Sequence, residues 1–147
     1  MPFASVFLVK GHAPERVRGV ITGISDAMER ITKSSRTVWV TEVEPELWAL
    51  EGVTAAERLR SKPIHEVDSP LVTMLLMRGR PPEQHRDLIA AVTEVVAGEL
   101  GMNPQAVRID IQESVPEFRD RRGAVQRDLT PTEVRGRGAP VPDCRRN

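Results

Sequence analysis

Pro2, the residue after the initiator methionine, has the clearest potential for chemistry in this sequence. Removal of Met1 would leave Pro2 as a free secondary amine. Such an amine can exchange a proton near neutral pH when its surroundings shift its pKa. Because proline also suits the second position of proteins that do no such chemistry, Pro2 indicates a site only if other residues join it.

Arg78 and Arg80 are the strongest candidate partners, because they follow an apolar run and are separated by a single residue. If an extended strand continues through them, both side chains point to the same face and form a fork suited to a carboxylate. The alternative is that both are solvated turn residues.

The remaining reactive side chains give weaker signals. His12, His65 and His85 have neither metal-ligand spacing nor a nucleophile as partner, so we expect surface or turn residues and no metal site. The single cysteine, Cys144, cannot form an internal disulfide, and nothing nearby would activate its thiol. The sequence contains no glycine-rich phosphate loop, HExxH motif or Gly-x-Ser-x-Gly motif.

Composition narrows the classes of partner. The 147 residues carry no formal net charge, and basic and acidic residues are interspersed except near the C-terminus. We therefore expect no binding to nucleic acid or to an anionic membrane surface. No apolar run is as long as a transmembrane helix, and the N-terminus lacks the features of a signal peptide, which favours a cytoplasmic location.

Two segments with the same order of elements carry the candidate residues. The first has an apolar strand over 2–11, an amphipathic helix with apolar residues from Val17 to Ile31, and a β-branched strand over 37–43. The second has a strand over 70–79, a helix with apolar residues from Leu88 to Leu100, and an alternating strand over 107–112.

Four pairs of residues are each 68 positions apart, which indicates duplication of one strand-helix-strand unit: Pro2 and Pro70, Gly11 and Gly79, Pro14 and Pro82, and Glu15 and Glu83. We expect a first repeat over 1–51, a connector with one helical turn near 55–60 over 52–69, and a second repeat over 70–118. Residues 119–147 form an arginine- and proline-rich tail with the composition of an extended segment.

The duplicated units, each beginning with a proline, resemble the tautomerase superfamily of the 4-oxalocrotonate tautomerase type. The residues that carry the resemblance are Pro2, Lys10-Gly11, Arg78-Gly79-Arg80, Arg108 and the segment 42–48, which ends in Trp48. The resemblance covers about residues 2–50 and 70–113. It implies an α/β (α+β) fold in which duplicated β-α-β units form a four-stranded sheet with two helices on one face.

In that fold the two first strands lie antiparallel, so the resemblance implies that Pro2 lies near Arg78 and Arg80. The reciprocal site would pair Pro70 with Lys10 and His12. Pro70 is peptide-bonded and cannot act as a base, and His12 stands where the second repeat has Arg80. We therefore expect one working site and one relic of the duplication.

The implied activity is keto-enol tautomerisation of small 2-oxo or 2-hydroxy unsaturated acids, with Pro2 as general base and no cofactor. Arg78, Arg80 and Arg108 would hold the substrate carboxylate, and Trp48 would exclude water. The family's assembly implies a homotrimer, a pseudo-hexamer of repeats.

Two other interpretations stay open. The chain also resembles malonate semialdehyde decarboxylase and cis-3-chloroacrylic acid dehalogenase, in which the proline stays protonated and acts as an acid. Ser35 stands where the decarboxylase has a water-activating aspartate, and the chain has no tyrosine to match the dehalogenase, so both activities are disfavoured. The third interpretation is a non-catalytic scaffold or ligand-binding protein.

Overall fold

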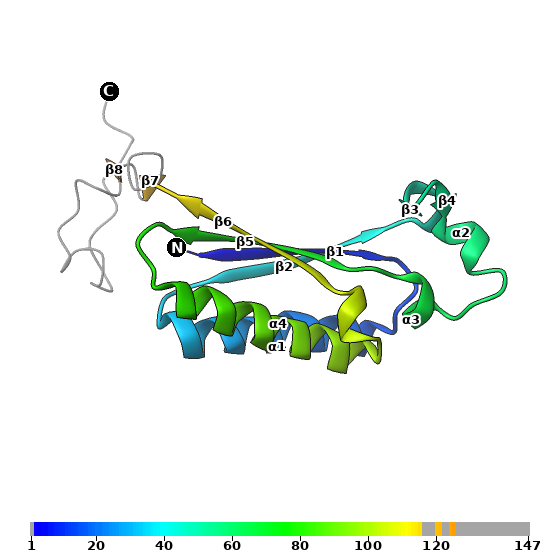
Figure 1. Ribbon diagram of the computed structural model, residues 1–147, viewed down its shortest axis with the longest axis horizontal. Coiled ribbons are helices and arrows are strands. Elements are labelled where there is room, and N and C mark those ends of the chain that lie inside the picture. The colour runs from blue at the N-terminus through cyan, green and yellow to red at the C-terminus, as the bar shows by residue number, and fades with distance from the viewer. Residues whose placement is uncertain (1, 116–119, 122–123, 126–147) are drawn as a thin grey trace, which may run out of the picture.

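A computed structural model describes residues 2–115, 120–121 and 124–125 of the chain. Its main elements are β1 (Phe3–Val9), α1 (Pro14–Thr32), β2 (Thr37–Val43), β5 (Leu71–Met77), α4 (Pro82–Leu100) and β6 (Arg108–Ser114). The four strands form one sheet in the order β2-β1-β5-β6, and α1 and α4 lie side by side on one face of it (Figure 1). The predicted fold class is confirmed.

The register joins the two repeats through their first strands. Within each repeat the strands are parallel: Phe3 pairs with Thr37 in the first, and Leu71 pairs with Arg108 in the second. Between the repeats β1 and β5 are antiparallel, with Phe3 opposite Leu75. The antiparallel arrangement implied by the family resemblance is therefore confirmed.

Both long helices have the same kinds of residue at their starts and ends. Each has a proline in its first turn followed by a glutamate, a combination suited to the positive end of the helix dipole. Each is followed by a residue in the left-handed conformation, Lys33 after α1 and Gly101 after α4. The N–H groups of these two residues bond the carbonyls of Glu29 and Ala97, which closes the last turns.

The core lies between the sheet and the two helices. Alternate residues of β1 and β5 face the helices, as the period of a strand requires, and pack on the apolar stripes of α1 and α4. The fully buried members are Ala4, Val6, Leu8, Val20, Ile24, Met28, Val72, Met74, Leu76, Leu88, Val92 and Val96. On the opposite face of the sheet Phe3 packs against Trp39, with ring centroids 5.1 Å apart, and Trp39 is 41% exposed.

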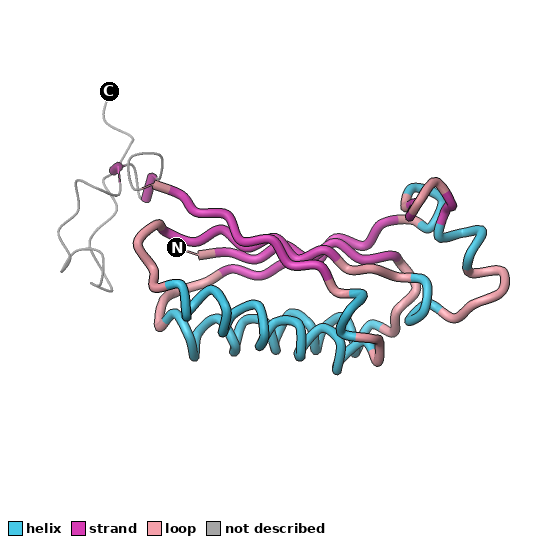
Figure 2. Tube along the Cα trace, viewed as in Figure 1, coloured by secondary structure: helices cyan, strands magenta, loops and turns pink. Residues whose placement is uncertain are grey.

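The segment between β2 and β5, which comprises the end of the first repeat and the connector, holds more structure than the sequence predicts. A 3₁₀ turn (Pro45–Leu47), a short hairpin of β3 (Ala49–Leu50) and β4 (Val53–Thr54), α2 (Ala55–Arg58) and α3 (Ile64–Val67) lie beyond one end of the sheet (Figure 2). The predicted helical turn near 55–60 is confirmed as α2. Ala55 and Val67 form a second small core with Val9, at the end of β1.

The tail predicted over 119–147 lies mostly outside the described residues, which include only β7 (Asp120–Arg121) and β8 (Ala124–Val125) there. A second 3₁₀ turn (Pro104–Ala106) precedes β6. Among the residues that the structure describes, none of the helices is long and apolar enough to cross a membrane.

Two helical glycines give a matched test of the packing between α1 and α4. A Cβ atom on Gly23 of α1 would lie 2.6 Å from Cγ1 of Val95 on α4, whereas a Cβ on Gly98 meets nothing within 4 Å. Alanine favours a helix by up to about 1 kcal/mol over glycine, but overpacking costs about 1–3 kcal/mol. We expect Gly98→Ala to raise the free energy of unfolding slightly and Gly23→Ala to lower it, measured by urea denaturation. Equal stabilisation by both changes would contradict this packing.

Candidate active site

The start of β1, directly after Pro2, lies at the end of the sheet where β5 turns into α4 (Figure 1). Since Phe3 pairs with Leu75 in the antiparallel register, Pro2 neighbours the last residues of β5, and Arg78 and Arg80 follow directly. Pro2 is buried, and its carbonyl oxygen accepts a hydrogen bond of 3.2 Å from the N–H of Thr37. The sheet topology thus brings the predicted base to the same end as the two predicted arginines.

Arg80 is held by two side chains that the sequence did not single out. Its Nη1 donates to Oε1 of Gln84 at 3.2 Å, and its Nη2 donates to Oγ of Ser34 at 3.4 Å. Its Nε is buried and has no hydrogen-bond partner among the described residues. Ser34 belongs to the turn between α1 and β2, so residues from both repeats position this guanidinium.

The electrostatics of Arg80 suit an anionic ligand. Burial lowers the pKa of its guanidinium, because removal from water disfavours the charged form. No carboxylate in the described part of the chain lies within ion-pair distance of Arg80. A half-buried cation without an anionic partner gains most from a ligand that brings a carboxylate, and the planar guanidinium matches that group.

Arg78 does not share the face of Arg80 by strand alternation. β5 ends at Met77, and Gly79 has φ of +96°, a left-handed conformation that breaks the extended chain between the two arginines. Arg78 is exposed, and its N–H donates to the carbonyl of Ser114 at 2.9 Å. The condition for the predicted fork, a strand continuing through both residues, is therefore not met. Arg78 nevertheless lies at the same end of the sheet as Pro2.

Arg108 and Trp48 lie at the other end of the sheet within one chain. Arg108 begins β6, and its N–H donates to the carbonyl of Pro70 at 2.9 Å. Trp48 packs on the small core formed by Val9, Ala55 and Val67. A single chain does not bring either residue to Pro2, so their predicted roles depend on a neighbouring copy and stay predictions.

His12 lies in the turn between β1 and α1, one of the two expected settings, but it is not at the surface. Its ring is 1% exposed, and Nε2 lies 2.7 Å from Oδ2 of Asp68, whose side chain is fully buried. The other oxygen of Asp68 accepts from the N–H of Val9 at 3.2 Å. His65 is about half exposed, as expected, whereas His85 is only 23% exposed, with Nε2 3.5 Å from Oε1 of Glu113.

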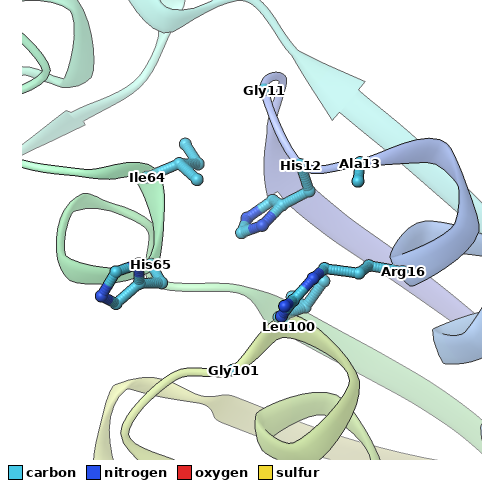
Figure 3. Close-up of a pocket in the computed structure, with 8 residues that line it drawn as sticks. All are labelled: Gly11, His12, Ala13, Arg16, Ile64, His65, Leu100 and Gly101. Carbon is cyan, nitrogen blue, oxygen red and sulfur yellow. The ribbon is translucent and has the colours of Figure 1, made fainter.

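A pocket of about 270 Å³ lies beside His12, at the end of the sheet opposite Pro2. Figure 3 shows the rings of His12 and His65 and the guanidinium of Arg16 around it, with Ile64 on another side. Leu100 and Gly101 of the α4 end complete one wall. No functional residue is predicted in the connector from the sequence. The connector nevertheless contributes Ile64 and His65 to the pocket lining, and it contains Asp68, the partner of His12.

Comparison with known proteins identifies the family. A family model described as tautomerase enzyme matches residues 70–117. A 2-hydroxymuconate tautomerase from Pseudomonas putida is 33% identical over 60 residues, which make up 39% of this chain and 95% of that protein. Because the match spans nearly the whole relative, the chain belongs to the tautomerase family.

Solved structures place it among the members with two fused repeats. The crystal structure of a native fused 4-OT is 29% identical, with a TM-score of 0.76 and coverage of 86% of this chain and 98% of that one. A second fused 4-OT, described as an asymmetric trimer, is 24% identical, with a TM-score of 0.73 and coverage of 86% and 97%. The similarity to the second structure shows only that the two chains share a fold.

The pair of His12 and Asp68 should contribute measurably to stability. Asp68→Ala would leave a buried imidazole and the N–H of Val9 without their acceptor, and each unsatisfied buried group costs about 1–3 kcal/mol. We expect the free energy of unfolding to fall by about 2–4 kcal/mol in urea denaturation at one fixed protein concentration. Asp87→Ala, at an exposed position of α4, is the control. Equal effects of the two changes would contradict a structural role for the pair.

Proposed function

We propose that the protein is a tautomerase in which the amine of Pro2 removes a proton from carbon next to a carbonyl group and returns it at another atom. The substrate class is small 2-oxo or 2-hydroxy unsaturated carboxylic acids. The observation that carries the proposal is the antiparallel register of β1 and β5, because it sets a buried Pro2 at the same end of the sheet as the half-buried Arg80.

The chemistry of Pro2 follows from its surroundings. Once Met1 is removed, we expect burial and nearby cations to favour the neutral form of the Pro2 amine, because both disfavour a charged amine. Arg80 and Arg78 would hold the substrate carboxylate and stabilise the negative charge that develops on the dienolate oxygen. The proton removed from carbon is the one returned, so the reaction balances without a cofactor.

We further propose a homotrimer in which a neighbouring copy supplies Arg108 and Trp48 to each Pro2. One supporting observation is that the sheet face opposite the helices carries Phe3 and the 41%-exposed Trp39, an apolar surface suited to a partner. Another is that a fused 4-OT of the same fold is described as a trimer. The separation of Arg108 and Trp48 from Pro2 within one chain is consistent with this arrangement.

Substitution of the two equivalent prolines, Pro2 and Pro70, is the central test of the proposed catalytic role of Pro2. Pro2→Ala should lower kcat/KM for a phenylenolpyruvate-type substrate by about 10²–10⁴-fold, the usual contribution of a general base. Pro70→Ala should keep the wild-type rate, because the nitrogen of Pro70 is an amide. Intact mass spectrometry must first show that Met1 is absent from each protein. Unchanged turnover in Pro2→Ala, or full activity with Met1 retained, would contradict the proposal.

Variants of Arg80 and Arg86 distinguish a role in binding the substrate carboxylate from a general effect of removing one positive charge. Arg80→Gln should lower kcat/KM by about 10- to 100-fold, mainly through a higher KM, because a hydrogen bond to a charged group contributes about 1.5–3 kcal/mol. Arg86→Gln removes the same charge at an exposed position of α4 and should have little effect. If both variants lose activity equally, Arg80 does not bind the substrate directly.

A further inference from the structure

The pocket beside His12 lies at the end of the sheet that is equivalent, in the duplicated fold, to the end that holds Pro2. At the same spacing of 68 positions, His12 is equivalent to Arg80 and Arg16 is equivalent to Gln84. The left-handed residue Gly101 is likewise equivalent to Lys33, which adjoins the Ser34 that holds Arg80. The pocket therefore occupies the reciprocal end of the sheet, where the amine is lost.

The lining of this pocket is basic on one side and apolar on another. His12, Arg16 and His65 supply nitrogen donors, and Ile64 and Leu100 supply apolar surface. None of the eight lining residues is acidic. Two carboxylates adjoin the lining. Asp68 is already engaged by His12 and the N–H of Val9, and Oε1 of the half-exposed Glu66 lies 4.0 Å from Nε2 of His65. A small anion with a carbon skeleton would satisfy both sides of this lining.

Two of the basic groups are held in place before any ligand binds. Asp68 fixes Nε2 of His12, so Nδ1 is the ring nitrogen left for a ligand. Nη1 of Arg16 donates to the carbonyl of Glu99 at 3.3 Å, at the C-terminal end of α4. A Cβ atom at position 101 would lie 2.7 Å from the same Nη1, so glycine there leaves room for the guanidinium. Such preorganisation lowers the cost of binding.

We propose that this pocket is a second binding site, specific for a small carboxylate that carries a neighbouring carbonyl or hydroxyl group. Arg16 and His65 bind the carboxylate, and Nδ1 of His12 hydrogen-bonds the neighbouring oxygen. The planar guanidinium favours a carboxylate, and the walls of Ile64 and Leu100 favour a ligand with carbon atoms over inorganic phosphate. The site does not use Pro2, so it stands independently of the proposed catalysis.

The competing explanation is purely structural. Arg16 then only stabilises the C-terminal end of α4, and the pair of His12 and Asp68 only anchors the connector to β1. Both roles predict effects of mutation on stability. Neither role predicts a saturable response to a ligand, so binding measurements separate the two explanations.

The experiment is a titration of the full-length protein carrying Pro2→Ala and Arg80→Gln, which removes the proposed catalytic site, with pyruvate at constant pH and ionic strength. The ring resonances of the three histidines are followed by NMR. We expect the resonances of His12 and His65 to shift saturably. The resonances of His85, in the first turns of α4 at the opposite end of the sheet, should stay unchanged. Pyruvamide, the uncharged analogue, should cause no shift.

A pair of arginine variants in the same background completes the test. Arg16→Gln should weaken pyruvate binding about tenfold or more, because it removes a charged hydrogen-bond donor. Arg18→Gln, an exposed position on the same helix that does not line the pocket, should leave the affinity unchanged. The proposal is overturned if His12 and His65 do not respond, if phosphate or pyruvamide produces the same response, or if the two arginine variants behave alike.

Discussion

The antiparallel pairing of β1 and β5 is the constraint on which the rest of the structure depends. Alternate residues of both strands, including Val6 and Val72, must face the helices together, and a slip of one residue would turn each apolar set to the wrong face. The hydrophobic pattern therefore fixes the register. The register in turn sets the start of β1 beside the end of β5, so core packing and the position of Pro2 relative to Arg80 have one physical cause.

Duplication creates two equivalent ends of the sheet, and covalent structure makes them different. Pro2 can have a free amine once Met1 is removed, whereas Pro70 continues from the connector through a peptide bond. The connector also changes the second end physically: Val67 is buried there, and Asp68 binds His12. The two ends have thus diverged in the groups that they can offer to a ligand, an amine and Arg80 at one, imidazoles and Arg16 at the other.

The sequence was sufficient to predict the main elements because each has a strong local signal. β2 spans Thr37–Val43, as its β-branched run predicts, and both helices follow their apolar stripes. The errors concern interactions that no local pattern encodes. Asp68 contacts His12 across 56 positions from a connector without periodicity, and the turn at Gly79 ends the alternation assumed for Arg78 and Arg80. The placement of Arg108 relative to Pro2 depends on assembly, which a single chain does not determine.

The ionisation of the Pro2 nitrogen tests the central claim most directly. It can be followed by ¹⁵N NMR during a pH titration of protein labelled at proline, with Pro2→Ala used to assign the resonance. A base created by burial and neighbouring arginines must have an amine pKa below the ordinary range for such a group. An amine pKa above that range would favour the acid role instead, and a Pro2 nitrogen that does not titrate, because Met1 remains attached, would contradict the account.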